Sequence, residues 1–456
     1  MILTRTQFAS LYINPAYDLK GITYKEKVSF YNEEGVLIFN TREFVNTLKF
    51  TCSIICYRED YLVYNYKTGL YDTLSIKDLV RLIKYILDNI DRSFWSIKNE
   101  SKIITLIERD YDTLKELPSY DEYIFFENGV YNIETKEFED YNPKLVVMNR
   151  IANKYNKNAQ CPLFLKFISE CMCGDEELIK CIQEIMGYVL IDTAKAQKLF
   201  LFYGIGSNGK SVLCDLIMHM LGKGNVSSIS LNQFKKDFTV SCIVGKKANI
   251  SSENEANFET EKLKAISSGD SITVDVKYKE PYEYKSTCKL IFASNTLPNT
   301  ADNTHGFYRR LLIIPFNRVI RDSEKDVNLI NKLTCEIEGI IMWALEGLHR
   351  LIDNNYKFTE SKVSKSLLSS YRENQDPVYS FFKERIKHDK NNKIDKKDLI
   401  SGYIDWIEFN SIDSNGTEST SKFWKELKRV SLLEGIKIEE VKSRNCRFIK
   451  HLGWVA

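Results

Sequence analysis

Residues 204–211 constrain this chain more than any other segment. They read Gly-Ile-Gly-Ser-Asn-Gly-Lys-Ser and match G-x-x-x-x-G-K-[ST] at every fixed position. An apolar run at 199–203 precedes them, and apolar side chains at helical spacing follow at 212–220. A strand, a glycine-rich loop and a helix in this order surround an anionic phosphate with backbone N–H groups and a helix N-terminus. We therefore expect a parallel α/β fold with a phosphate-binding loop.

The loop predicts both the ligands and the residues that hold them. Lys210 is expected to reach the β- and γ-phosphates of ATP, and the Ser211 hydroxyl is expected to hold Mg²⁺. Because loop amides surround the phosphates, the predicted nucleotide contacts are Gly204, Gly206, Ser207, Asn208, Gly209, Lys210, Ser211 and Val212. The predicted cofactors are ATP and Mg²⁺.

Charge and composition narrow the class of protein. The 456 residues carry 64 basic and 62 acidic side chains, a net charge of +2, so any nucleic-acid contact must come from local patches. Residues 1–20 lack the apolar stretch of a secretory signal, and no apolar run reaches the roughly 18 residues of a membrane span. We expect a cytoplasmic protein without membrane contact, whose eleven cysteines are reduced thiols.

Changes in periodicity predict four parts. Residues 1–152 mix short strands and helices. The patterns predict a hairpin around 67–69, an amphipathic helix at 79–90 and a strand–turn–strand at 126–133. The polar run 153–160 is typical of a linker. Residues 160–195 have a helical period. Residues 196–355 alternate strands with helices, which is typical of a parallel sheet covered by helices. Residues 375–456 form a small unit with three helical patterns and a strand pair, compatible with a winged helix.

Three further segments could complete a nucleotide-hydrolysing site. Glu253 and, as second choice, Glu255 follow a short apolar segment, where a carboxylate can bind Mg²⁺ through water and polarise an attacking water. Asn295 ends the apolar strand 289–294, where a polar residue can orient the hydrolytic water. Acidic strand ends are also common without function, so the acids alone leave both interpretations open.

Two basic segments suggest contacts outside the subunit's own loop. Alternating residues flank a predicted hairpin tip that carries Lys277, Tyr278 and Lys279, where lysines can pair with phosphates and a tyrosine can stack on a base. Arg309 and Arg310 precede another apolar strand, and an arginine there suits a finger that reaches a neighbouring subunit's γ-phosphate. The alternatives are a solvated hairpin tip and two solvated arginines.

Together these segments resemble the superfamily 3 helicases, and most closely the phage, plasmid and poxvirus-type primase-helicase group. The resemblance rests on GIGSNGKS at 204–211, ISSENE at 250–255, LKAISSGDSITVDVKYKEP at 263–281, LIFASN at 290–295 and GFYRRLLIIPF at 306–316. Motif order, spacing and residue type all match over about 120 residues.

The resemblance implies an AAA+-like core, a hexameric ring, ATP hydrolysis and 3′→5′ translocation on single-stranded DNA. It also implies that the helical residues 160–195 are the accessory, or collar, segment of that group. It implies that Glu253 or Glu255 is the Walker B acid and that Asn295 is the polar sensor. It places Lys277, Tyr278 and Lys279 on a DNA hairpin in the central channel. Arg310, with Arg309 as second choice, would be the arginine finger. Lys264 would contact nucleotide across the interface.

The two ends of the chain give different expectations. A primase site of the two-metal type needs a D-x-D pair and a later histidine, yet no histidine occurs in the first 218 residues. We therefore expect residues 1–152 to bind or assemble, with any primase a separate protein. The C-terminal unit carries basic residues around Trp424 and Trp454 and is predicted to contact duplex DNA, such as an origin. These basic residues are Lys425, Lys428, Arg429, Lys437, Lys442, Arg444, Arg447 and Lys450.

The sequence thus predicts an ATP-dependent hexameric DNA helicase acting on single-stranded and forked DNA, in replication initiation of a phage, plasmid or genomic island. The alternative is an origin-binding ATPase switch that assembles on DNA without unwinding. A small-molecule P-loop kinase is a third class, which the motif spacing disfavours.

Overall fold

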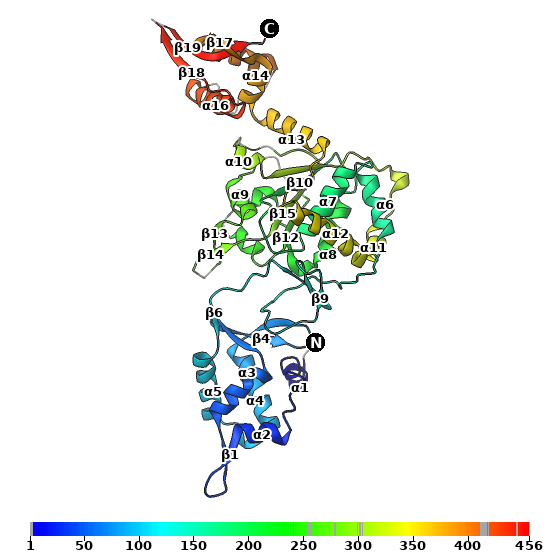
Figure 1. Ribbon diagram of the computed structural model, residues 1–456, viewed down its shortest axis with the longest axis vertical. Coiled ribbons are helices and arrows are strands. Elements are labelled where there is room, and N and C mark those ends of the chain that lie inside the picture. Colours follow the sequence, from blue (N-terminus) through cyan, green and yellow to red (C-terminus); the bar gives the residue numbers. More distant parts are fainter. Residues whose placement is uncertain are drawn as a thin grey trace. The chain divides into compact units, whose positions relative to one another are not determined.

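The computed structural model describes residues 3–236, 238–252, 258–277, 280–298, 300, 302, 304–410, 417, 419–443 and 446–455. The chain forms two compact units, Met1–Lys157 and Asn158–Ala456. The first is drawn from blue to cyan and the second from cyan-green to red (Figure 1). Within the described residues, no helix combines the length and the apolar character that crossing a bilayer requires.

The first unit is built around a four-stranded sheet of order β5-β4-β3-β6. These strands are β3 (Ile54–Tyr57), β4 (Asp60–Asn65), β5 (Leu70–Leu74) and β6 (Thr113–Leu114). The hairpin predicted around the turn 67–69 is confirmed as β4 and β5. The sequence-predicted amphipathic helix is confirmed as α4 (Ile76–Ile90), whose Leu79, Leu82 and Ile83 are completely buried.

Further short elements complete the first unit. The remaining helices are α1 (Arg5–Ala9), α2 (Ile22–Val28), α3 (Thr41–Thr51) and α5 (Ile97–Asp110). One small sheet pairs β1 (Ser29–Tyr31) with β2 (Leu37–Phe39). A second small sheet joins β7 (Tyr123–Phe126), β8 (Gly129–Asn132) and β9 (Phe138–Glu139). The predicted strand–turn–strand around residue 129 is therefore also confirmed.

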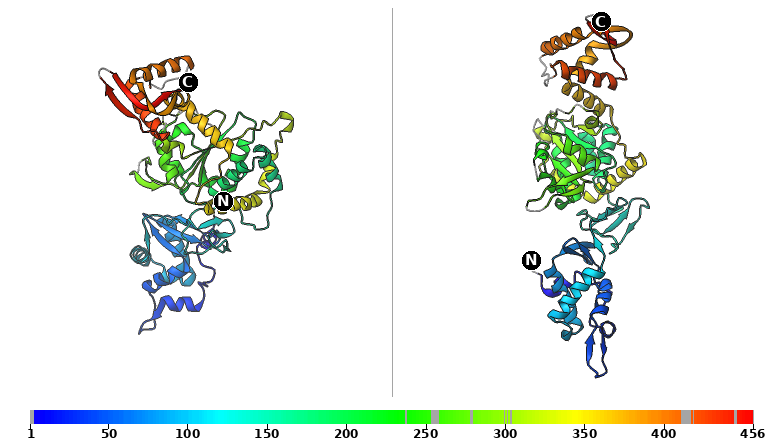
Figure 2. Two further views of the ribbon diagram at one scale, coloured as in Figure 1. Left: turned by 45° about the horizontal axis from the view of Figure 1, so that its top comes forward. Right: turned by 90° about the vertical axis from the view of Figure 1, so that its left-hand side faces the viewer.

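The second unit contains a five-stranded parallel sheet of order β11-β12-β15-β10-β16 (Figure 2). Its strands are β10 (Leu199–Tyr203), β11 (Val226–Ser227), β12 (Ala248–Ser251), β15 (Lys289–Ser294) and β16 (Leu311–Pro315). The sequence reads these strands as near-continuous apolar runs because both faces of a parallel sheet are buried. The predicted parallel sheet is thus present.

The order of the strands creates a switch point at β10. After β10 the chain crosses to the edge strand β11 and returns through β12 to β15, which pairs with one side of β10. The chain then passes to the other side of β10 and forms β16. In open α/β sheets, ligands bind outside the carboxyl ends of the strands at such a point.

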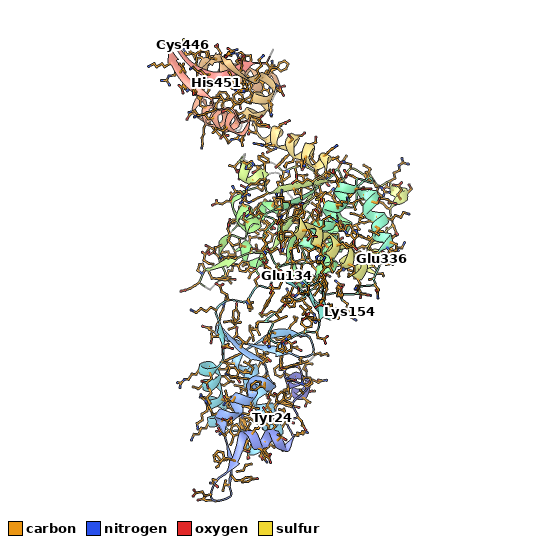
Figure 3. All side chains as sticks on the ribbon, in the orientation of Figure 1. Tyr24, Glu134, Lys154, Glu336, Cys446 and His451 are labelled. Atoms are coloured by element: carbon orange, nitrogen blue, oxygen red, sulfur yellow. The ribbon has the colours of Figure 1, made fainter. Side chains whose placement is uncertain are left out.

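Helices α6 (Pro162–Cys171) and α7 (Glu176–Tyr188) belong to the packing of the second unit. Helix α7 packs along α12 (Ile337–Asp353), and α6 contacts α11 (Leu329–Thr334). The carboxylate of Glu336, labelled in Figure 3, accepts the Leu163 and Phe164 amides at the start of α6. A side chain far along the sequence therefore caps this helix.

Two glycines allow the close approach of α7 and α12. A Cβ on Gly187 would lie 2.4 Å from the Ala344 carbonyl oxygen. A Cβ on Gly347 would lie 2.4 Å from the Gln183 carbonyl oxygen. The helices therefore meet backbone to backbone, with no room for a side chain at either position.

The sheet is accompanied by α8 (Lys210–Leu221), α9 (Glu261–Ser268) and α10 (His305–Tyr308). A two-stranded hairpin, β13 (Ser271–Val274) and β14 (Tyr282–Lys285), stands apart from the parallel sheet. This confirms the hairpin that the sequence predicted around residues 277–281. Helix α13 (Lys362–Gln375) packs against β16.

The C-terminal elements follow the order α14 (Pro377–Arg385), β17 (Ile386–Asp395), α15 (Lys396–Asn410), α16 (Thr420–Leu433), β18 (Glu439–Ser443) and β19 (Cys446–Trp454). The sheet order is β17-β19-β18. The sequence predicted three helices and one strand pair but missed β17. That strand is almost entirely polar and changes register between His388 and Lys393, so it lacks the alternation that marks a half-buried strand.

We predict that Gly347→Ala lowers the free energy of unfolding by about 1–3 kcal/mol, because the added methyl must push α12 away from α7. Chemical denaturation of the full chain measures this effect. Gly224→Ala is the matched control, because a Cβ there meets nothing within 4 Å. Equal denaturation midpoints for the two variants would contradict the close packing.

Candidate nucleotide-binding site

A cavity of about 500 Å³ lies at the carboxyl ends of β10 and β15. Its volume is within the range of pockets that hold small molecules. It is lined by the predicted loop and by residues from four other segments. These residues are Phe167, Gly206, Ser207, Asn208, Gly209, Lys210, Ser211, Val212, Ser252, Ala293, Ser294, Asn295, Ile320, Glu324, Lys325, Asp326 and Leu329.

The loop backbone has the conformation of an anion-binding nest. Gly206, Ser207 and Gly209 have φ angles of 115°, 46° and 89°. In the described part of the chain, the amide N–H groups of residues 207–212 find no protein acceptor. They line the cavity at the N-terminus of α8, where the helix dipole adds positive potential. This end of the cavity therefore fits a phosphate group.

Glycine at 209 is required by both conformation and space. A Cβ there would lie 2.5 Å from the Cys171 Sγ and 3.3 Å from the Phe167 ring. Cys171 and Phe167 come from α6, so the accessory helix supports the loop directly. Burial raises the pKa of the Cys171 thiol to about 12, which keeps the sulfur in its neutral form.

Lys210 joins the loop to the neighbouring strand. Its Nζ donates to the Gly204 carbonyl oxygen at 2.5 Å, to the Asn208 Oδ1 at 3.0 Å and to the Asn295 Oδ1 at 3.2 Å. Burial lowers the pKa of this ammonium. The structure therefore brings together Lys210 and Asn295, two residues that the sequence predicted for one site.

The loop is also fixed by the segment that follows β16. The Asn208 Nδ2 donates to the Phe316 carbonyl oxygen at 3.3 Å, and the Ile320 amide donates to the Ser207 carbonyl oxygen at 2.7 Å. On the other side, the Gly204 amide donates to the Ser294 carbonyl oxygen at 3.3 Å. Both neighbours of β10 thus anchor the loop.

The predicted acids Glu253 and Glu255 lie outside the described residues. The chain is described as far as Ser252, which follows β12 and lines the cavity. The roles predicted for the two carboxylates stay predictions. Ser211 lines the cavity and is exposed, so its hydroxyl is available to a cation beside the phosphates.

Lys264 does not line this cavity; it forms an ion pair with Asp302 at 2.6 Å. Burial opposes ionisation of Asp302, but hydrogen bonds from Lys264, Thr260 and Thr304 outweigh it and lower the pKa to about 2. The pair ties α9 to the segment that follows β15.

Arg309 and Arg310 lie at the amino end of β16, at the opposite end of the sheet from the loop. The five residues of β16 alone span roughly 16 Å. Arg309 is exposed and donates to the Gln197 Oε1 at 3.2 Å. Arg310 is half-buried and donates to the Ser268 Oγ and the Gly306 carbonyl oxygen, at 2.6–2.9 Å. Neither arginine lines the cavity beside the loop.

Lys277 is exposed in the turn between β13 and β14. Tyr278 and Lys279, the other two residues of the predicted DNA contact, lie outside the described residues. Cross-strand hydrogen bonds stabilise the hairpin near its base, where the Ser271 and Thr273 hydroxyls donate to the Glu283 carboxylate at 2.5 and 3.1 Å.

In the C-terminal unit, part of the predicted basic surface is wrong. Arg429 is half-buried and forms ion pairs with Asp376 and Glu426, and Trp424 is buried. Both residues lie on the inner side of α16 because its side chains repeat every 3.6 residues. A list of basic residues along the sequence does not show which helix face each one occupies. Arg444 lies outside the described residues. The exposed basic side chains are Lys425, Lys428, Lys437, Lys442, Arg447 and Lys450.

Sequence reasoning missed Phe167 and the cavity wall formed by residues 320–329. These residues carry no motif, and only folding brings them to the loop. The one available signal is the apolar helical period of 162–171, which predicts burial and gives no information about the partner.

The chain matches two family models. Residues 57–173 match the family described as "D5 N terminal like", and residues 202–310 match a "Family of unknown function (DUF5906)". The second match covers the loop, β15 and both arginines.

The relatives and solved structures that are similar to the chain include the following two. The protein named "Putative helicase L207/L206" of Acanthamoeba polyphaga mimivirus is 25% identical over 340 residues, which cover 67% of this chain. The chain spans about a third, 35%, of the length of that relative. The apo structure of the C-terminal region of NrS-1, residues 305–718, aligns with a TM-score of 0.51 and 13% identity. It covers 91% of this chain and 99% of that chain, and the likeness is one of fold.

We predict that Gly209→Ala destabilises the loop by at least the 1–2 kcal/mol or so that a left-handed backbone costs an L-residue. The new methyl also contacts Cys171. Combining Gly209→Ala with Cys171→Ala should therefore recover only the steric part of the lost free energy of unfolding. The free energy of unfolding of the two variants, with Cys171→Ala alone as reference, checks this. A Gly209→Ala protein as stable as the parent would show that the loop is not held against α6.

The mimivirus match and the match at residues 57–173 relate the chain to a protein named as a helicase and to the family described as "D5 N terminal like". They agree with the helicase part of the resemblance that the motifs carry.

Proposed function

We propose that this chain is an ATP-driven DNA helicase that assembles as a homo-hexamer and moves 3′→5′ on single-stranded DNA. Its work would be replication initiation of a phage, plasmid or genomic island. The observation that carries the proposal is the Lys210–Asn295 contact in a cavity beside the glycine-rich loop. A triphosphate bound by the loop amides would meet one cationic and one water-orienting side chain.

The residues of the cavity suit ATP and Mg²⁺. The free loop amides and Lys210 would bind phosphate oxygens, and Ser211 would hold the cation. Bound Mg²⁺ neutralises charge on the phosphates. Asn295 would orient the attacking water, and Glu253 or Glu255 would polarise it.

The position of the arginines favours action between subunits. Arg309 and Arg310 lie at the amino end of the sheet, whereas the loop lies at the carboxyl end. An arginine that completes a site must therefore come from a neighbouring protomer, as in a ring. This geometry supports the AAA+-like assignment and the hexamer.

The strand order and the C-terminal elements support the finer fold assignment. A parallel sheet with the loop at its switch point suits an AAA+-like P-loop core. The order α14, β17, α15, α16, β18, β19 combines helices with a hairpin, which suits a winged-helix-like unit. Lys425 and Lys428 are exposed on α16 and would contact origin duplex DNA.

The mimivirus relative supports a helicase function, but only part of that relative is matched by this chain. The mimivirus protein is named as a helicase, and this chain spans about a third of it. No histidine occurs in the first 218 residues, so we assign no primase chemistry to the first unit and expect a separate primase.

We predict that Lys210→Ala and Arg310→Ala subunits are each inactive in ATP turnover, and that mixing them restores part of it. In the mixture some interfaces combine an intact Lys210 with an intact arginine from the neighbour. The measurement is the ATPase rate of pure and mixed preparations with single-stranded DNA.

The same mixing experiment with Arg309→Ala identifies which arginine acts. Lys223→Ala is the control for a lysine change, since Lys223 is exposed beside α8. Turnover that stays absent in every mixture would argue against sites shared between subunits.

We predict that Lys277→Ala, alone or with Lys279→Ala, keeps basal ATPase activity but loses most strand separation on a forked substrate. Without these lysines, the hairpin tip would no longer bind the phosphate backbone of DNA. Lys285→Ala is the matched control, because Lys285 is exposed at the base of the same hairpin. Full unwinding by the tip variants would refute the channel role. A parent chain that hydrolyses ATP on DNA without any unwinding would favour the origin-binding switch instead.

A further inference from the structure

The lining of the cavity combines two kinds of chemistry. The loop amides, Lys210 and Asn295 form a polar surface that suits an anion. Three apolar side chains, Phe167, Ile320 and Leu329, line the same cavity together with Glu324, Lys325 and Asp326. A ligand with an anionic part and an apolar part matches this lining better than a bare anion does.

Apart from Phe167, these apolar and charged residues all belong to residues 316–329, which we call the strap. The strap begins at Phe316, directly after β16, and ends at the start of α11. Two hydrogen bonds hold it to the loop, from the Asn208 Nδ2 to the Phe316 oxygen and from the Ile320 amide to the Ser207 oxygen. Loop and strap therefore form one structure around the cavity.

Arg318 joins the strap to α6. Its guanidinium forms one ion pair with Glu170 of α6 and a second with Glu324 of the strap, at 3.8 Å. Phe167 lies about one helical turn before Glu170 on α6, so this ion pair links the strap to the helix that carries Phe167. Arg318 makes this link without lining the cavity itself.

The carboxylates of the strap disfavour a phosphate beside them. Asp326 accepts from the Lys332 Nζ at 2.6 Å and from the Asn328 amide at 2.9 Å, and the lysine bond, followed by the amide bond, lowers its pKa. Glu324 accepts the Arg321 amide at 3.2 Å. The strap also carries Lys325, whose ammonium is paired with Asp322 at 2.7 Å. A neutral group with hydroxyl donors suits these carboxylates better than a triphosphate does.

We infer that the strap is the nucleoside-binding wall of the cavity. The base of the nucleotide packs against Phe167, Ile320 and Leu329, and the ribose hydroxyls face Glu324 and Asp326. Arg318 is a positioning residue that holds the strap against α6. The inference rests on the proposed function, because it assigns the second half of the ligand that the loop binds.

Inorganic tripolyphosphate separates the two halves of the ligand, since it has the phosphates and lacks the nucleoside. Calorimetric titration of the full chain with ATP and with tripolyphosphate, each with Mg²⁺, should show that Ile320→Ala and Leu329→Ala weaken ATP binding roughly tenfold. The same variants should leave tripolyphosphate binding unchanged. Val327→Ala is the matched control, because Val327 lies in the strap and is 90% exposed.

Arg318→Ala should raise the KM for ATP with little change in kcat at saturating ATP, and Arg318→Lys should restore part of the affinity. Equal losses for ATP and tripolyphosphate, or no loss for either, would overturn the assignment of the strap. A thermal melt of each ligand-free variant identifies loss of folding. Failure of the proposed ATP site gives a different result, since the parent chain would then bind neither ligand. A parent chain that binds ATP but does not unwind DNA would overturn the helicase proposal and leave the assignment of the strap intact.

Discussion

The pairing of β10 between β15 and β16 is the constraint on which the rest of the site depends. Parallel pairing places the ends of adjacent strands at one edge, so the loop after β10 and Asn295 after β15 must meet there. The Lys210–Asn295 hydrogen bond and the Ser294–Gly204 backbone bond are consequences of that register. The same pairing carries Arg309 and Arg310 to the opposite edge of the sheet, away from the loop of the same chain.

The accessory helices are part of the site. Helix α6 presses Cys171 and Phe167 against Gly209, and α7 is held to α12 by two glycine contacts. Glu336 caps α6 from a distant part of the sequence, and Arg318 links α6 to the strap. A chain of contacts therefore runs from α12 through α6 to the phosphate loop, so a change in the accessory helices would alter the shape of the nucleotide cavity.

Sequence patterns predicted most of the second unit because its core obeys simple periodicities. The boundaries of β10 agree with the prediction, since five apolar residues before a glycine loop leave little freedom. The predicted hairpin at β13 and β14 is also present. The prediction failed at β17, whose polar sequence has no strand period, and at Arg429 and Trp424, whose burial depends on which face of α16 packs inward. Glu253, Glu255, Tyr278 and Lys279 remain predictions.

The sequence by itself determined the loop, the strands around it and the chemistry of a phosphate site, because these depend on residues adjacent in the chain. Only the tertiary structure decided what closes the cavity. Phe167 lies more than one hundred residues before Ile320 and Leu329 in the sequence, and none of the three belongs to a motif. No local pattern could therefore join them. Their meeting depends on long-range packing of α6 and the strap, and on an Arg318 whose two acidic partners lie on different elements.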